Sequence, residues 1–79
     1  MYQEIEASEV IIAEYQLRVF NKDKGKTMLN RYITNKELAI KLFNEQVKIY
    51  HNLPIRVIII LYDMNKCTNI EHYDSDDNI

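Results

Sequence analysis

The sequence predicts an α+β fold of order ββαββ, in which a four-stranded antiparallel sheet carries one helix on one face. Three observations lead to this prediction: a nearly unbroken apolar run at 53–62, a turn-rich segment at 21–26, and a helix-start signature at 34–37. A chain of 79 residues has room for one domain. We expect that domain to occupy residues 1–73, followed by an acidic disordered tail at 74–79.

The first strand is predicted from apolar and polar residues that alternate over residues 10–20. One face holds the apolar set Ile11, Ala13, Tyr15, Leu17 and Val19. Asn21 to Lys26 is typical of a turn, with Gly25 free to adopt a positive φ, and residues 27–33 return as a second strand. A helix over residues 8–20 remains the alternative, because Glu, Ala, Gln, Leu and Arg all favour helices.

A helix is expected to start at Thr34, because Thr34-Asn35-Lys36-Glu37 matches a capping box. In this motif the Thr hydroxyl bonds the backbone of Glu37, and the Glu37 carboxylate reaches back. It should end near Tyr50 or His51, because Asn52 can cap it and Pro54 cannot continue it. Its apolar arc covers more than half of the circumference and includes Leu42 and Ile49. A helix that packs on one sheet needs an apolar stripe only a little over about 100° wide. Part of this arc is therefore left over for contact with another partner.

The apolar run Leu53 to Tyr62 predicts a buried central strand that begins at Pro54. Five β-branched residues favour a strand here: Ile55, Val57, Ile58, Ile59 and Ile60. Both faces of this strand are apolar, since Ile55, Val57, Ile59 and Leu61 alternate with Ile58, Ile60 and Tyr62. A turn at 63–66, with Asn65 as the left-handed residue, and a last strand at 67–73 complete the sheet.

The second apolar face of the sheet indicates self-association or a partner protein. A chain this short buries only about 60 % of its unfolded surface, so an oligomer would supply missing stability. The residues expected at a dimer or partner interface are Ile58, Ile60, Tyr62 and Phe20 on the sheet, with Leu42 and Ile49 on the helix. We therefore expect a homodimer, or a complex with a host or partner protein that the sequence does not identify.

Enzymatic activity is not expected. Gly25 is the only glycine, so phosphate-cradling loops and nucleophile elbows are excluded. We find no paired carboxylates on one element, no nucleophile with a base and no ligand cluster of strong spacing, and we predict neither cofactor nor metal. His72 beside the acidic tail lacks the spacing of a calcium loop. The function expected is a small non-catalytic interaction module, an inhibitor or adaptor that acts by stoichiometric binding.

A basic hairpin offers an alternative function. Lys22, Lys24 and Lys26 could contact phosphates and make the chain a nucleic-acid-binding domain, although the net charge is −2. A single cysteine, an N-terminus without signal-peptide features and the lack of a membrane-length apolar run indicate a cytoplasmic protein. The bias towards Ile, Asn, Lys and Tyr suggests an AT-rich genome, and a short chain poor in cysteine and glycine suggests a phage or other mobile element as the source.

Overall fold

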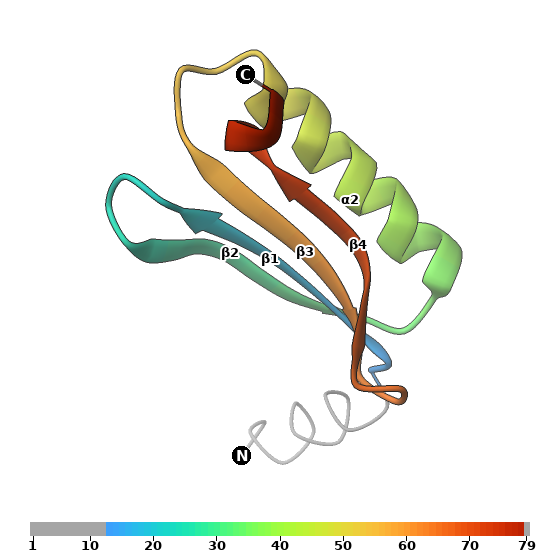
Figure 1. Cartoon of the computed structure of the whole chain (residues 1–79). Coiled ribbons are helices and arrows are strands. Elements are labelled where there is room, and N and C mark those ends of the chain that lie inside the picture. Colours follow the sequence, from blue (N-terminus) through green and yellow to red (C-terminus); the bar gives the residue numbers. More distant parts are fainter. Residues whose placement is uncertain (1–12, 79) are drawn as a thin grey trace, which may run out of the picture.

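The computed structural model describes residues 13–78 and shows a four-stranded antiparallel sheet with one helix across one face (Figure 1). The elements are β1 (Tyr15–Asn21), β2 (Lys26–Ile33), α2 (Lys36–His51), β3 (Val57–Asp63), β4 (Thr68–Asp74) and the short 3-10 helix η1 (Ser75–Asn78). The strands lie in the order β2-β1-β3-β4, so β1 and β3 are central and β2 and β4 form the edges. The predicted ββαββ fold is confirmed.

The core lies between α2 and the two central strands. β1 and β3 pair so that Val19 lies opposite Ile59 and Leu17 opposite Leu61. These four side chains and Val57 have no solvent exposure at all. α2 contributes Ala39 and Phe43 from its buried stripe. One alternating half of the apolar run therefore forms the sheet side of the core, as its period of two predicts.

β1 resolves the choice between strand and helix for most of the first element. Residues 15–20 belong to a strand that is paired on both sides, and residues 8–12 lie outside the described residues. Glu14 precedes β1, yet its backbone is also held on both sides. Its N–H donates to the Ile33 carbonyl at 3.2 Å, and its carbonyl accepts from the Met64 N–H at 2.8 Å.

The start of α2 differs from the prediction by one residue, because Asn35 rather than Thr34 is the N-cap. Asn35 has extended backbone angles, and its Oδ1 accepts a hydrogen bond from the Leu38 N–H at 2.9 Å. Asn is as good a cap as Thr, and this choice places Glu37 within the first turn, outside the capping-box position. The other end is as predicted, since α2 ends at His51 with Asn52 as its C-cap.

The prediction that β3 begins at Pro54 is wrong. β3 begins at Val57, which pairs with Asn21, the last residue of β1. The Lys22 N–H still donates to the Arg56 carbonyl at 2.8 Å, but the chain turns away at residues 22–25 and the ladder stops there. Ile55 and Arg56 instead complete the connection from α2.

The turn between β3 and β4 is also corrected. Cys67, with a φ of 55°, is the left-handed residue rather than Asn65, and the last strand begins after it at Thr68. Asp63 organises this turn by accepting hydrogen bonds from the backbone N–H groups of Asn65 and Lys66 at 2.9 and 3.1 Å. The Asp63 side chain thus binds the backbone N–H of Asn65, and the left-handed backbone conformation occurs two residues later, at Cys67.

Candidate interaction surface

The sheet face that α2 does not cover is the candidate interaction surface, and we call it the open face. The strand register decides its membership, because paired residues share a face. On the central strands it consists of Gln16, Arg18, Phe20, Ile58, Ile60 and Tyr62. The edge strands add Thr27, Asn30 and Tyr32 from β2, and Asn69, His72 and Asp74 from β4.

The centre of the open face is apolar and hollowed. Phe20 lies opposite Ile58 in the β1–β3 ladder, and Phe20 remains 37 % exposed. These two side chains and Ile60, with Arg18 and Thr27, line a hollow of about 280 Å³. A hollow of this size is smaller than a pocket for a drug-sized ligand, and it suits one or two apolar side chains of a protein partner.

Arg18 stands within this apolar surface. It lies opposite Ile60 on β3, and its side chain is exposed. Across residues 13–78 its guanidinium makes no hydrogen bond or ion pair. A partner that covers the open face would therefore have to leave Arg18 in water or bring a carboxylate to it.

The six residues expected at an interface divide between two surfaces. Phe20, Ile58, Ile60 and Tyr62 all lie on the open face. Leu42 and Ile49 lie on α2, on the other side of the sheet, where Leu42 is half-buried and Ile49 is 51 % exposed. A single contact between two copies can cover one of these surfaces, so the sheet residues and the helix residues are separate candidates.

Within the described residues, the acidic tail belongs to the fold and makes ion pairs with it. Asp74 is the last residue of β4, and η1 follows directly. The Lys22 ammonium contacts the carboxylates of Asp74, at 3.0 Å, and Asp76. Opposite charges that are distant in the chain therefore meet here, which the prediction of a disordered tail did not anticipate.

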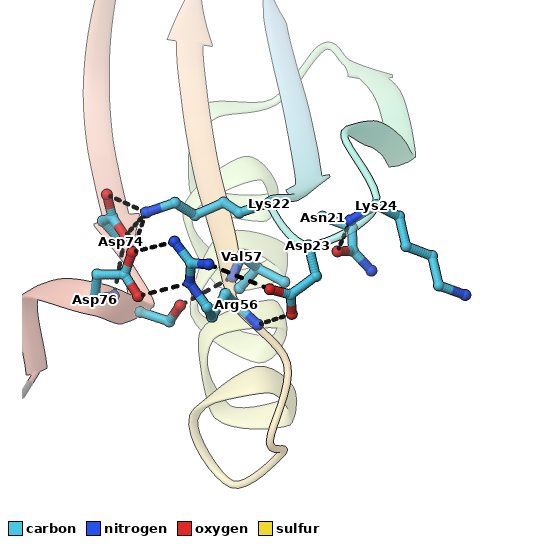
Figure 2. A network of polar contacts seen from close by, with 9 residues as sticks. Asn21, Lys22, Asp23, Lys24, Arg56, Val57, Asp74 and Asp76 are labelled. Carbon is cyan, nitrogen blue, oxygen red and sulfur yellow. Dashed lines mark hydrogen bonds and ion pairs between the residues drawn. The ribbon is translucent and has the colours of Figure 1, made fainter.

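Arg56 extends these contacts into a network, which we call the hairpin–tail cluster (Figure 2). Its guanidinium lies between Asp76, at 3.2 Å, and Asp23 of the β1–β2 turn, at 3.4 Å. The Val57 backbone N–H also donates to the Ser75 Oγ at 2.9 Å. The cluster joins the hairpin turn, the start of β3 and η1 at one end of the sheet.

The cluster shifts the ionisation of its members. Hydrogen bonds from Arg56 and Lys22 lower the pKa of Asp76 from 3.8 to about 2. The pKa of Asp74 is lowered by the backbone N–H of Asp76 and by Lys22. The pKa of Lys22 is raised by its hydrogen bonds to Asp76 and Asp74. These shifts favour the charged form of each group.

We expect the cluster to make stability depend on pH in the acid range. The pKa of Asp76 is lower in the folded chain than in the unfolded chain, so its contribution is complete above about pH 5 and is lost as pH falls towards 2. An Asp76→Asn variant should melt below the wild type at neutral pH, and the gap should close towards pH 2. Asp77→Asn is the matched control, since exposed Asp77 makes no ion pair within the described chain. A gap that stays constant with pH would contradict the ion-pair assignment.

The three lysines expected to contact phosphate differ in their ion pairs and in their exposure to solvent. Lys22 is occupied by Asp74 and Asp76, and its side chain is only 20 % exposed. Lys24 and Lys26 are exposed. Sequence reasoning missed Arg56, Asp74 and Asp76 as partners of this hairpin. The opposite charges of the hairpin and the tail were the available signal.

A larger open cleft of about 680 Å³ lies between the end of α2, the α2–β3 connection and η1. Tyr50, Leu53 and Tyr73 provide its apolar wall, and Arg56 and Asp76 its charged one. Because Arg56 and Asp76 are paired with each other, the cleft presents no unopposed charge to a ligand.

Neither metal-binding nor membrane-spanning features occur in the part of the chain that the structure describes. Residues 13–78 contain no group of three His, Cys, Asp or Glu side chains that could hold a metal ion. Over the same residues, no helix has the length and apolar character to cross a membrane. Cys67 is an exposed free thiol in the β3–β4 turn, and His72 lies on the open face.

No protein-family model matches the chain, and no curated protein or solved structure shows significant similarity to it.

Proposed function

We propose that this protein is a small non-catalytic interaction module that binds stoichiometrically through its open face and forms a homodimer through that face. The observation that carries the proposal is the apolar centre of the open face, where Phe20, Ile58 and Ile60 surround a hollow on the two central strands. Apolar surface concentrated in this way is typical of protein–protein contacts. An inhibitor or adaptor of phage or mobile-element origin would act in this manner.

The energetics favour covering this surface. Moving one such side chain wholly out of water contributes about 1.5–3 kcal/mol, and a two-fold contact counts each residue twice. α2 covers only the opposite face, so within residues 13–78 the open face has no second layer. A second copy is the simplest cover, because a closed two-fold pair is the commonest form of self-association.

Sedimentation equilibrium at micromolar concentration tests the homodimer. We expect a species of twice the 9.5 kDa chain mass. A 9.5 kDa species at every concentration up to the millimolar range would contradict self-association and leave the open face to a different protein partner.

We place the protein in the cytoplasm as part of this proposal. The support is that Cys67 is exposed and unpaired, which suits a reducing compartment.

Nucleic-acid binding through the β1–β2 hairpin is the alternative function, supported by the exposed ammonium groups of Lys24 and Lys26. A Lys24→Glu, Lys26→Glu variant should then lose a mobility shift seen with the wild type, and binding should weaken steeply with salt. A Lys41→Glu, Lys48→Glu variant of the exposed side of α2 makes the same charge change elsewhere. An equal loss in both variants would point to non-specific charge, and an unchanged shift in the hairpin variant would contradict the alternative.

A further inference from the structure

We propose that residues 1–12 of the same chain dock on the open face and compete there with a second copy. This inference rests on the proposed function, because it names the regulation of the same surface. Three observations carry it: where the described chain begins, how far twelve residues reach, and how their charges and apolar groups complement the open face.

The described chain enters the fold at the middle of the sheet. Hydrogen bonds to Ile33 and Met64 hold the Glu14 backbone on both sides, between the ends of β2 and β3. The described chain therefore begins beside the two central strands. One face there is covered by α2, and the other is the open face.

Twelve residues are long enough to reach the hollow. They span about 18 Å as a helix and up to about 40 Å when extended. The whole of β1, from Tyr15 to Asn21, spans about 23 Å. Measured along the strand direction from Ala13, Arg18 is about 17 Å away and within reach in either conformation, whereas Phe20, about 23 Å away, is within reach of the extended segment.

The composition of the segment complements the open face. It contains apolar Tyr2, Ile5, Val10, Ile11 and Ile12. Its charged residues are Glu4, Glu6 and Glu9, with no lysine or arginine. The open face offers apolar groups around an Arg18 that has no partner within residues 13–78.

A second copy satisfies Arg18 less well. A second copy would offer two carboxylates from the described chain: that of Asp74, which Lys22 already binds, and that of Glu14, which continues the alternation of β1 at the start of the strand. The chain's own segment supplies three carboxylates at a high local concentration. Dimerisation must then displace the segment from both copies, so the apparent association constant of the dimer is multiplied by the square of the fraction of time that the face is free.

Paramagnetic broadening in the full-length protein tests the docking. A spin label is attached at Gln3→Cys in a Cys67→Ser background, and a small amount of labelled, ¹⁵N-enriched chain is diluted into unlabelled, unmodified chain. Dilution restricts the broadening to contacts within one chain. We expect broadened amide signals at Arg18, Ile58 and Ile60, with Leu38 on the outer side of α2 unaffected. Unaffected open-face signals, or broadening on α2, would overturn the proposal.

A reversed isotope mixture separates the same chain from its neighbour. Here the ¹⁵N-enriched chain carries no label and the spin-labelled chain is unenriched. Open-face broadening that appears only in this mixture would show docking between copies and would overturn docking within one chain.

Charge reversal gives a second readout by sedimentation. Replacing Glu4, Glu6 and Glu9 with Lys should release the segment and tighten the dimer about 100-fold if the segment covers each face for nine-tenths of the time, because both copies must free the face before they pair. Adding Arg18→Glu to this variant should restore the broadening and the weaker dimer. A dimer unaffected by the triple replacement would overturn the competition. A chain that remains monomeric yet shows open-face broadening would contradict only the homodimer.

Discussion

An Ile59→Ala variant should lose about 2–5 kcal/mol of unfolding free energy, the usual cost of removing a buried Ile or Leu side chain. Ile59 has no solvent exposure and lies opposite Val19 at the centre of the sheet, beneath α2. A domain of this size has about 4–12 kcal/mol in total, at about 0.05–0.15 kcal/mol per residue. The variant should therefore melt well below the wild type or be unfolded at 37 °C, as circular dichroism during heating would show.

Ile60→Ala is the matched control for that variant. It makes the same chemical change at the next residue, but Ile60 points to the open face and is only half-buried. Its loss of stability at concentrations where the chain is monomeric should be clearly smaller. Equal losses for the two variants would contradict the assignment of the two faces of β3.

Replacing Ile60 with glutamate should weaken self-association about 10²–10⁴-fold. Ile60 is already half-buried in one copy, so each lost contact removes about half of the 1.5–3 kcal/mol of a wholly buried Ile, and a two-fold contact loses it twice. Since about 1.4 kcal/mol corresponds to a factor of ten, this loss alone weakens the dimer about 10–10²-fold. The introduced carboxylate also resists burial at the hollow lined by Phe20 and Ile58. Sedimentation equilibrium across a concentration series measures the change.

Ile49→Glu is the control for the interface, since it adds the same charge on the exposed side of α2. It should leave the dimer intact if the open face is the contact. A dimer that Ile49→Glu disrupts and Ile60→Glu does not would move the interface to α2. Circular dichroism must show that both variants remain folded.

The element order and the faces of the central strand followed from short-range patterns. An alternation of period two places Val57, Ile59 and Leu61 on one side of β3 and Ile58, Ile60 and Tyr62 on the other in any sheet. The turn at residues 22–25 and the helix end at His51 likewise depend on local chemistry, namely Gly25 and Asn52. Such features involve neighbours within a few residues, so the sequence is sufficient to predict them.

Element boundaries depended on partners that the local sequence does not reveal. β3 starts at Val57 because β1 ends at Asn21, and no property of Pro54 indicates where that ladder stops. Thr34 and Asn35 are both competent caps, and Asn35 is the one whose Oδ1 accepts from the Leu38 N–H. At the β3–β4 turn, the Asp63 side chain holds Asn65 and the left-handed position falls on Cys67.

The sequence by itself determined that this protein has a ββαββ order and a central strand with two apolar faces, because the period of a strand is a local property. Only the tertiary structure decided that Arg18 stands without a partner among apolar side chains within residues 13–78, and that Lys22 is already occupied by Asp74 and Asp76. Three strands and a helix lie between Lys22 and Asp76 in the chain. Charge pairs of this kind form through packing, and residue spacing alone does not specify them.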